Sequence, residues 1–177
     1  MKTIMKITAT VVLAFSGSVL AGGDPVTPEI LALRDFSASV VNIEKRDTEC
    51  KHQKQELPYS EIQALGLSVP SLKVALRYHF ANASYLCVKS EISEFLLSTA
   101  ALKDLAKETP QTKAFKEGLD GGNSLMITHL SQTYKAKADY LALTKSERDS
   151  IETISALKTP FDLMVAAQAL DLFTKQQ

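Results

Sequence analysis

The longest helical pattern in the chain is VPSLKVALRYHFANASYLCVKSEISEFLLSTAALKDLAK, residues 69–107. It opens with Val69-Pro70-Ser71, and a proline is tolerated in the first turn of a helix because the N–H that it lacks has no partner there. Apolar residues then recur three or four positions apart, at Leu76, Phe80, Ala83 and Cys87 and again at Ile92, Phe95, Leu96 and Ala100. This spacing is typical of an α-helix that buries one side.

The segments before this stretch are also helical in pattern. Thr27-Pro28-Glu29 combines an N-cap residue, a proline and an acidic first turn, which predicts a helix over residues 28–52. Its apolar face contains Leu33, Phe36, Val40 and Ile43. Leu57-Pro58 interrupts the pattern, and a short helical turn over residues 61–65 is expected to end at Gly66.

Further helices are predicted after residue 107. Thr109-Pro110 begins a short helix that we expect to end at Gly118 and a turn over residues 120–123. Ser124 opens the next helix, whose apolar residues on one side are Ile127, Leu130, Tyr134, Ala138 and Leu141. Thr144 and Glu147 form a capping box, and Thr159-Pro160 begins a last helix with the apolar residues Leu163, Ala166, Ala167, Leu170 and Phe173.

The sequence therefore predicts an all-α fold. It contains no run of alternating β-branched residues, no repeat and no long linker. We expect a single helical bundle domain of about five to seven helices over residues 22–177.

Residues 1–21 have the pattern of a cleaved signal peptide. Lys2 and Lys6 precede an uncharged run over residues 7–21, which ends in Val19-Leu20-Ala21. The alternative is an uncleaved membrane anchor, but this run is shorter than the about 20 residues that a membrane-spanning helix needs. We therefore expect export, with a periplasmic or secreted location for residues 22–177.

Charge and hydropathy exclude two classes of partner. The chain has 20 basic and 20 acidic residues, and two of the basic residues leave with the signal peptide. No basic block remains that could follow a phosphate backbone, so we expect no nucleic-acid partner. No segment after residue 21 is apolar enough to span a membrane.

The two cysteines, Cys50 and Cys87, are predicted to form a disulfide. An even cysteine count in an exported chain favours pairing. Cys50 lies on the same helix face as Ile43, and Cys87 continues the face of Phe80 and Ala83. The bond would join the end of the first helix to the middle of the long one and hold residues 53–70 close to the bundle. The alternative is a pair of buried, reduced thiols.

The residues that usually carry catalysis or bind metals do not form a known pattern. The three histidines, His52, His79 and His129, lack the spacing of a zinc site. Cys-x-x-Cys and Gly-x-Ser-x-Gly motifs are also absent. We therefore expect no cofactor, no metal and no catalytic residue, although an enzyme with an unfamiliar helical active site stays an alternative.

These observations favour a non-enzymatic protein that binds a protein partner in the envelope or secreted space. Inhibitors, toxin-neutralising (immunity) proteins and envelope accessory factors belong to this class. The alternatives are a carrier with an apolar pocket near Phe36, Tyr78, Phe80 and Phe95, and a helical envelope chaperone. The candidate binding surface contains Pro58 and Tyr59 in segment 53–70, with Arg77, Tyr78 and His79 as a second choice.

Overall fold

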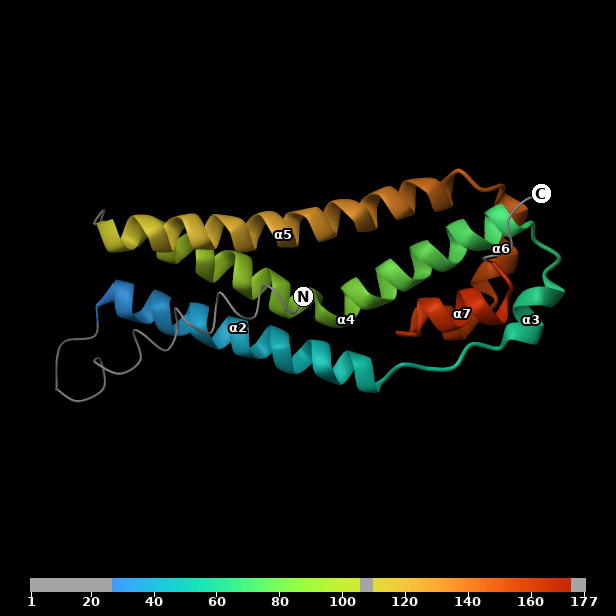
Figure 1. Cartoon of the computed structure of the whole chain (residues 1–177), viewed down its shortest axis with the longest axis horizontal. Helices are drawn as coiled ribbons and strands as arrows, with labels where there is room; N and C mark the ends of the chain where they lie inside the picture. The colour runs from blue at the N-terminus through green and yellow to red at the C-terminus, as the bar shows by residue number, and fades with distance from the viewer. Residues whose placement is uncertain (1–26, 106–109, 173–177) are drawn as a thin grey trace. The chain divides into compact units, whose positions relative to one another are not determined.

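The structure is a computed structural model that describes residues 27–105 and 110–172. The predicted signal peptide, residues 1–21, lies outside them. The described elements are α2 (Pro28–His52), α3 (Tyr59–Ala64), α4 (Val69–Leu105), α5 (Pro110–Leu141), α6 (Lys145–Glu152), the 3₁₀-helix η1 (Ser155–Lys158) and α7 (Leu163–Ala169) (Figure 1). Within these residues no strand forms beyond one isolated bridge between Gln55 and Phe161. The all-α prediction is confirmed, and the six described α-helices agree with the expected number.

The ends of several helices follow the capping residues in the sequence. Both α2 and α4 begin where the patterns predicted them. The predicted capping box is present at the start of α6. There the Glu147 backbone N–H donates to the Thr144 hydroxyl at 3.2 Å, and the Thr144 N–H donates to the Glu147 carboxylate at 2.9 Å. Both bonds satisfy backbone donors that the first turn leaves without intrahelical partners.

The turn predicted at residues 120–123 is wrong, because α5 runs without interruption from Pro110 to Leu141. Tertiary contacts outweigh the weak helix propensity of the glycines. Leu119 is buried in a core cluster, Asp120 pairs with Lys103 of α4, and a Cβ at Gly122 would lie 3.7 Å from the Phe95 ring. The short helix predicted to end at Gly118 and the helix predicted to begin at Ser124 are therefore one long helix.

Alanine in place of Gly118 or Gly121 is expected to stabilise the protein by about 0.5–1 kcal/mol each. Both glycines are helical, and a Cβ added at either position would meet no atom within 4 Å. Gly66 provides the matched control, because its φ of +64° is unfavourable for alanine and Gly66→Ala should destabilise by about 1–2 kcal/mol. Urea unfolding followed by circular dichroism would measure these changes. A destabilising Gly118→Ala would contradict the continuous helix.

The last helix begins later than the sequence predicted. Asp162 is its N-cap, and its carboxylate accepts hydrogen bonds from the N–H groups of Met164 at 3.0 Å and Val165 at 3.2 Å. Phe161 is almost fully buried and its backbone forms the bridge to Gln55, so these residues are extended and not helical. The first turn proposed at Thr159-Pro160 is therefore wrong.

The described residues group into two units, and α2, α4 and α5 each contribute to both. Unit 1 contains residues 27–45, 90–105 and 110–127, and unit 2 contains residues 46–89 and 128–172. The buried cluster of unit 1 consists of Ala32, Phe36, Ile43, Phe95, Leu102 and Leu119. Its centre is the contact between the rings of Phe36 and Phe95, whose centroids are 5.7 Å apart. Three of these six side chains, Phe36, Ile43 and Phe95, belong to the apolar faces predicted for α2 and α4.

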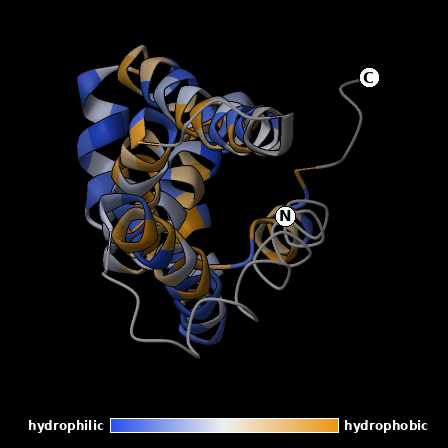
Figure 2. Cartoon of the chain, turned by 90° about the vertical axis from the view of Figure 1, so that its left-hand side faces the viewer, coloured by the Kyte–Doolittle hydropathy of each residue, from blue (hydrophilic) through white to orange (hydrophobic). Residues whose placement is uncertain are grey.

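Unit 2 has the larger buried cluster. Its side chains come from α3, the first half of α4, the end of α5 and the elements after α5. Its members are Leu57, Ile62, Leu72, Ala75, Leu76, Tyr140, Ile151, Ile154, Leu157, Phe161, Ala166, Leu170 and Leu172. Hydrophobic and hydrophilic residues alternate around the long helices (Figure 2), as expected for helices that are buried on one side.

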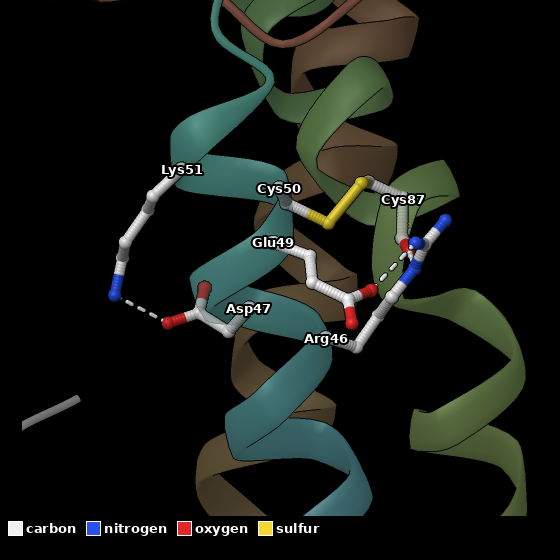
Figure 3. The surroundings of a disulfide bond; sticks show 6 residues. All are labelled: Arg46, Asp47, Glu49, Cys50, Lys51 and Cys87. Atoms are coloured by element: carbon white, nitrogen blue, oxygen red, sulfur yellow. Dashed lines mark hydrogen bonds and ion pairs between the residues drawn. A yellow bond between two sulfur atoms is a disulfide. The ribbon is translucent and has the colours of Figure 1, made fainter.

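The predicted disulfide is confirmed. Cys50, in the last turn of α2, forms a disulfide with Cys87 of α4, and the two Cα atoms are 6.1 Å apart (Figure 3). A second link lies beside it, because Arg46 Nε donates to the Cys87 carbonyl oxygen at 2.8 Å while Arg46 Nη1 pairs with Glu49 at 3.0 Å. The end of α2 is thus fastened to α4 both covalently and by a charge-assisted hydrogen bond.

Candidate functional site

Segment 53–70, which contains the predicted surface residues Pro58 and Tyr59, is fixed at several points. Its side chains Leu57 and Ile62 are buried in the core of unit 2. The Gln55 N–H donates to the Pro160 carbonyl at 2.8 Å, and Lys54 Nζ lies 3.1 Å from a carboxylate oxygen of Asp162. The disulfide is therefore one of several contacts that hold this segment.

Pro58 and Tyr59 themselves are half-buried. Tyr59 packs against the unit 2 cluster, and burial together with the carboxylates of Glu56 and Asp162 raises the pKa of its hydroxyl. Both residues present only part of their side chains to solvent, and binding at this position stays a prediction.

The second predicted group, residues 77–79, is directed mostly inward. Arg77 is exposed and forms an ion pair with Asp139 of α5. Tyr78 is half-buried and stacks on Tyr140, with ring centroids 4.3 Å apart and planes 15° from parallel. His79 is 3% exposed, so a partner cannot reach it without rearrangement of unit 2. Of the three residues, only Arg77 has a largely accessible side chain.

His79 is the buried member of a polar cluster whose carboxylate, Glu152, and ammonium group, Lys158, reach solvent. Its Nε2 atom has no hydrogen-bond partner and lies 3.9 Å from Glu152 Oε1, which accepts a hydrogen bond from the Tyr140 hydroxyl at 3.1 Å. The other Glu152 oxygen pairs with Lys158 at 3.3 Å. Burial lowers the pKa of His79, Glu152 opposes that shift and Lys158 adds to it. The imidazole is therefore neutral near pH 7, and its ring packs against those of Tyr78 and Tyr140.

This cluster predicts a pH-dependent stability. Because the pKa of His79 is lower in the folded protein than its ordinary value of about 6.5, the unfolded chain takes up the proton first. Stability is therefore lost as the pH falls through that ordinary value towards the folded pKa. His79→Phe should remove this contribution, so acidification from pH 7.5 to 5.5 should destabilise the wild type more than the variant in urea titrations. An equal loss in both proteins would contradict the prediction.

The apolar side predicted for residues 127–141 of α5 faces solvent. We define the α5 stripe as Leu130, Tyr134, Ala138 and Leu141, all in unit 2. Tyr134 is 67% exposed and Leu141 55%; Ile127, seven residues before Tyr134, is also 55% exposed. The buried side of the same helix is formed by Leu119, Thr133, Ala136 and Tyr140.

The flanks of the α5 stripe carry positive charge. Lys135 follows Tyr134 by one residue and Lys137 by three, which places them on opposite sides of the stripe at 100° per residue. Both lysines are exposed, and neither has an ion-pair partner among the described residues. The stripe is thus an apolar row with one such lysine on each side.

The sequence shows that the residues of the α5 stripe share one helix face, but it does not show whether that face is exposed or buried. Its residues are spaced as a helix face, and the same spacing is typical of a buried face. The residues that distinguish the two lie on the opposite side of the helix, where Ala136 and Tyr140 are buried and Tyr140 belongs to the core cluster of unit 2.

The aromatic residues suggested for a ligand pocket pack against other side chains. Phe36 and Phe95 lie in the core of unit 1, whereas Tyr78 and Phe80 contact Tyr140 and Phe161 in unit 2. Within residues 27–105 and 110–172, no three His, Cys, Asp or Glu side chains gather as a metal site would require. Among the same residues, no helix combines the length and hydropathy needed to cross a bilayer.

Comparison with known proteins identifies no relative. No protein-family model, no curated protein and no solved structure matches the chain.

Proposed function

We propose that this protein is exported and acts, without catalysis, by binding a protein partner through the α5 stripe. The observation that carries the proposal is the exposure of Tyr134 and Leu141 on a helix whose opposite side is packed in the core. A contiguous row of exposed apolar residues is a common mark of an interaction surface, and tyrosine is enriched among residues that dominate binding energy.

The disulfide and the leader sequence support this proposal. The pattern of residues 1–21 is that of a secretory signal, and the Cys50–Cys87 bond suits an oxidising compartment. A helical scaffold cross-linked between α2 and α4 presents a surface that needs little ordering when it binds. Inhibitors, toxin-neutralising proteins and envelope accessory factors all work in this way.

Affinity purification of residues 22–177 from a periplasmic extract of the native source tests the proposal. The wild type should recover one stoichiometric protein, and Tyr134→Asp/Leu141→Asp should lose it. The matched control is Met164→Asp/Val165→Asp, which alters two apolar residues that are 59% and 50% exposed on α7 of the same unit. A partner that the stripe variant retains, or the absence of any stoichiometric partner, would overturn the proposal.

A further inference from the structure

Unit 1 contains a groove between α2 and α4. Its volume is about 470 Å³, and its lining residues are Asp35, Ala38, Ser39, Asn42, Glu94, Leu97, Ser98 and Ala101. On each helix these residues follow the spacing i, i+3, i+4, i+7, so each wall is one face of a helix. A groove with two helical walls is a shape that receives a third helix.

Small side chains form the floor of the groove. The hydroxyl oxygens of Ser39 and Ser98 lie 3.1 Å apart, and each hydroxyl also donates to a carbonyl of its own helix. Ala38 and Ala101 leave space beside them, while Leu97 is 71% exposed on the α4 wall. The groove therefore has a floor of small side chains and one apolar side chain, Leu97, that lacks cover.

The charged groups of the groove are both carboxylates. Asp35 belongs to the α2 wall and Glu94 to the α4 wall. The two helices run in opposite directions (Figure 1), and the Ser39–Ser98 contact joins them near the middle of the groove, so the helical spacing puts Asp35 towards one end and Glu94 towards the other. Arg34 Nε is 3.9 Å from Asp35 with both side chains mainly exposed, a pair too weak to occupy the carboxylate. Glu94 has no ion-pair partner among the described residues.

The α5 stripe is complementary to this groove in shape and charge. Ala138 is small, as a position opposite the projecting Leu97 requires, and Tyr134 and Leu141 lie four residues before it and three residues after it, towards the two ends of the groove. Lys135 and Lys137 flank the stripe on opposite sides, so one ammonium group faces each acidic wall. Lysine side chains are long and flexible enough to reach a carboxylate at the edge of such a contact.

We propose that the groove of one copy receives the α5 stripe of a second copy. This inference rests on the proposed function and identifies its partner. The contact is heterologous, since two different surfaces meet, and an open assembly keeps a free groove at one end and a free α5 stripe at the other. Pairing of like surfaces is disfavoured, because stripe on stripe would bring the lysines together and groove on groove would bring Asp35 and Glu94 together.

Sedimentation velocity of residues 22–177 tests this contact by charge exchange. Three proteins are compared with the wild type at about 100 µM: Asp35→Lys/Glu94→Lys, Lys135→Glu/Lys137→Glu, and the variant with all four changes. The wild type should form species larger than the monomer. Each double variant should associate at least about tenfold more weakly, because like charges then meet. The four changes together, or an equimolar mixture of the two double variants, should restore association.

Two outcomes would overturn the proposal: a wild type that remains monomeric, or a fourfold variant that does not regain association. All four positions are exposed, and circular dichroism should show that every variant is folded. A monomeric wild type that still recovers a different protein in the affinity purification would refute self-association alone and leave the proposed function intact. Recovery of the untagged chain itself would support both.

Discussion

Removal of the Cys50–Cys87 disulfide is expected to lower the free energy of unfolding by about 3–4 kcal/mol. The cysteines are 37 residues apart in sequence, and a cross-link over such a loop restricts the unfolded chain by about that amount. Cys50→Ala/Cys87→Ala should therefore unfold at a much lower urea concentration than the wild type. Far-UV circular dichroism would measure the shift in the midpoint.

Reduction supplies the matched control for the disulfide. Dithiothreitol should shift the wild-type midpoint towards that of the double variant and leave the variant unchanged. The Arg46 hydrogen bond to the Cys87 carbonyl does not involve the sulfur atoms, so we expect it to keep one contact between α2 and α4 in the reduced protein. If dithiothreitol left the urea midpoint of the wild type unchanged, this result would contradict a stabilising role for the disulfide.

Phe161→Ala is expected to cost about 3–5 kcal/mol of stability, because it removes a buried ring and leaves a cavity. Phe161 is 1% exposed, and its ring meets that of Phe80 at a centroid distance of 5.9 Å. Its backbone also bridges to Gln55, so the change affects the contact that holds segment 53–70. Urea unfolding followed by circular dichroism measures the loss.

Tyr134→Ala is the control for the loss of an aromatic ring. Tyr134 is exposed, and a surface substitution of this kind usually changes stability by less than about 0.5 kcal/mol. If Phe161→Ala were as mild as Tyr134→Ala, the placement of Phe161 in the core would be wrong.

Most of the fold could be predicted because local patterns and tertiary packing agree. Thr144 and Glu147 cap the helix that they predicted, and the apolar spacing around Phe36 and Phe95 identified two faces that pack together. The disulfide followed from the positions of Cys50 and Cys87 on predicted helix faces.

The errors arise where local preference and tertiary contacts disagree. Glycines at 121 and 122 usually mark a turn, but Leu119 and Asp120 anchor this part of α5 to α4 within unit 1. Similarly, Thr159-Pro160 has the pattern of a helix start, but burial of Phe161 draws the backbone into an extended bridge.

The candidate site was harder to predict than the fold. A single sequence shows that Tyr134 and Leu141 share a helix face, but only packing shows that this face lies outside the core. The groove was not predicted, because its floor consists of Ser39, Ser98 and small neighbours that no apolar pattern includes. His79 was included in the candidate binding surface beside Arg77, but it is buried and its ring packs against that of Tyr140.

Site-specific photo-crosslinking in the native compartment tests the binding surface most directly. A photoreactive phenylalanine analogue at position 134 should yield a discrete adduct, of a second copy or of another protein, and the same analogue at position 164 should not. Positions 134 and 164 are both exposed in unit 2, but only position 134 belongs to the α5 stripe. A difference in crosslinking between them therefore shows which surface binds. No adduct at 134, or the same adduct at both positions, would contradict binding through the α5 stripe.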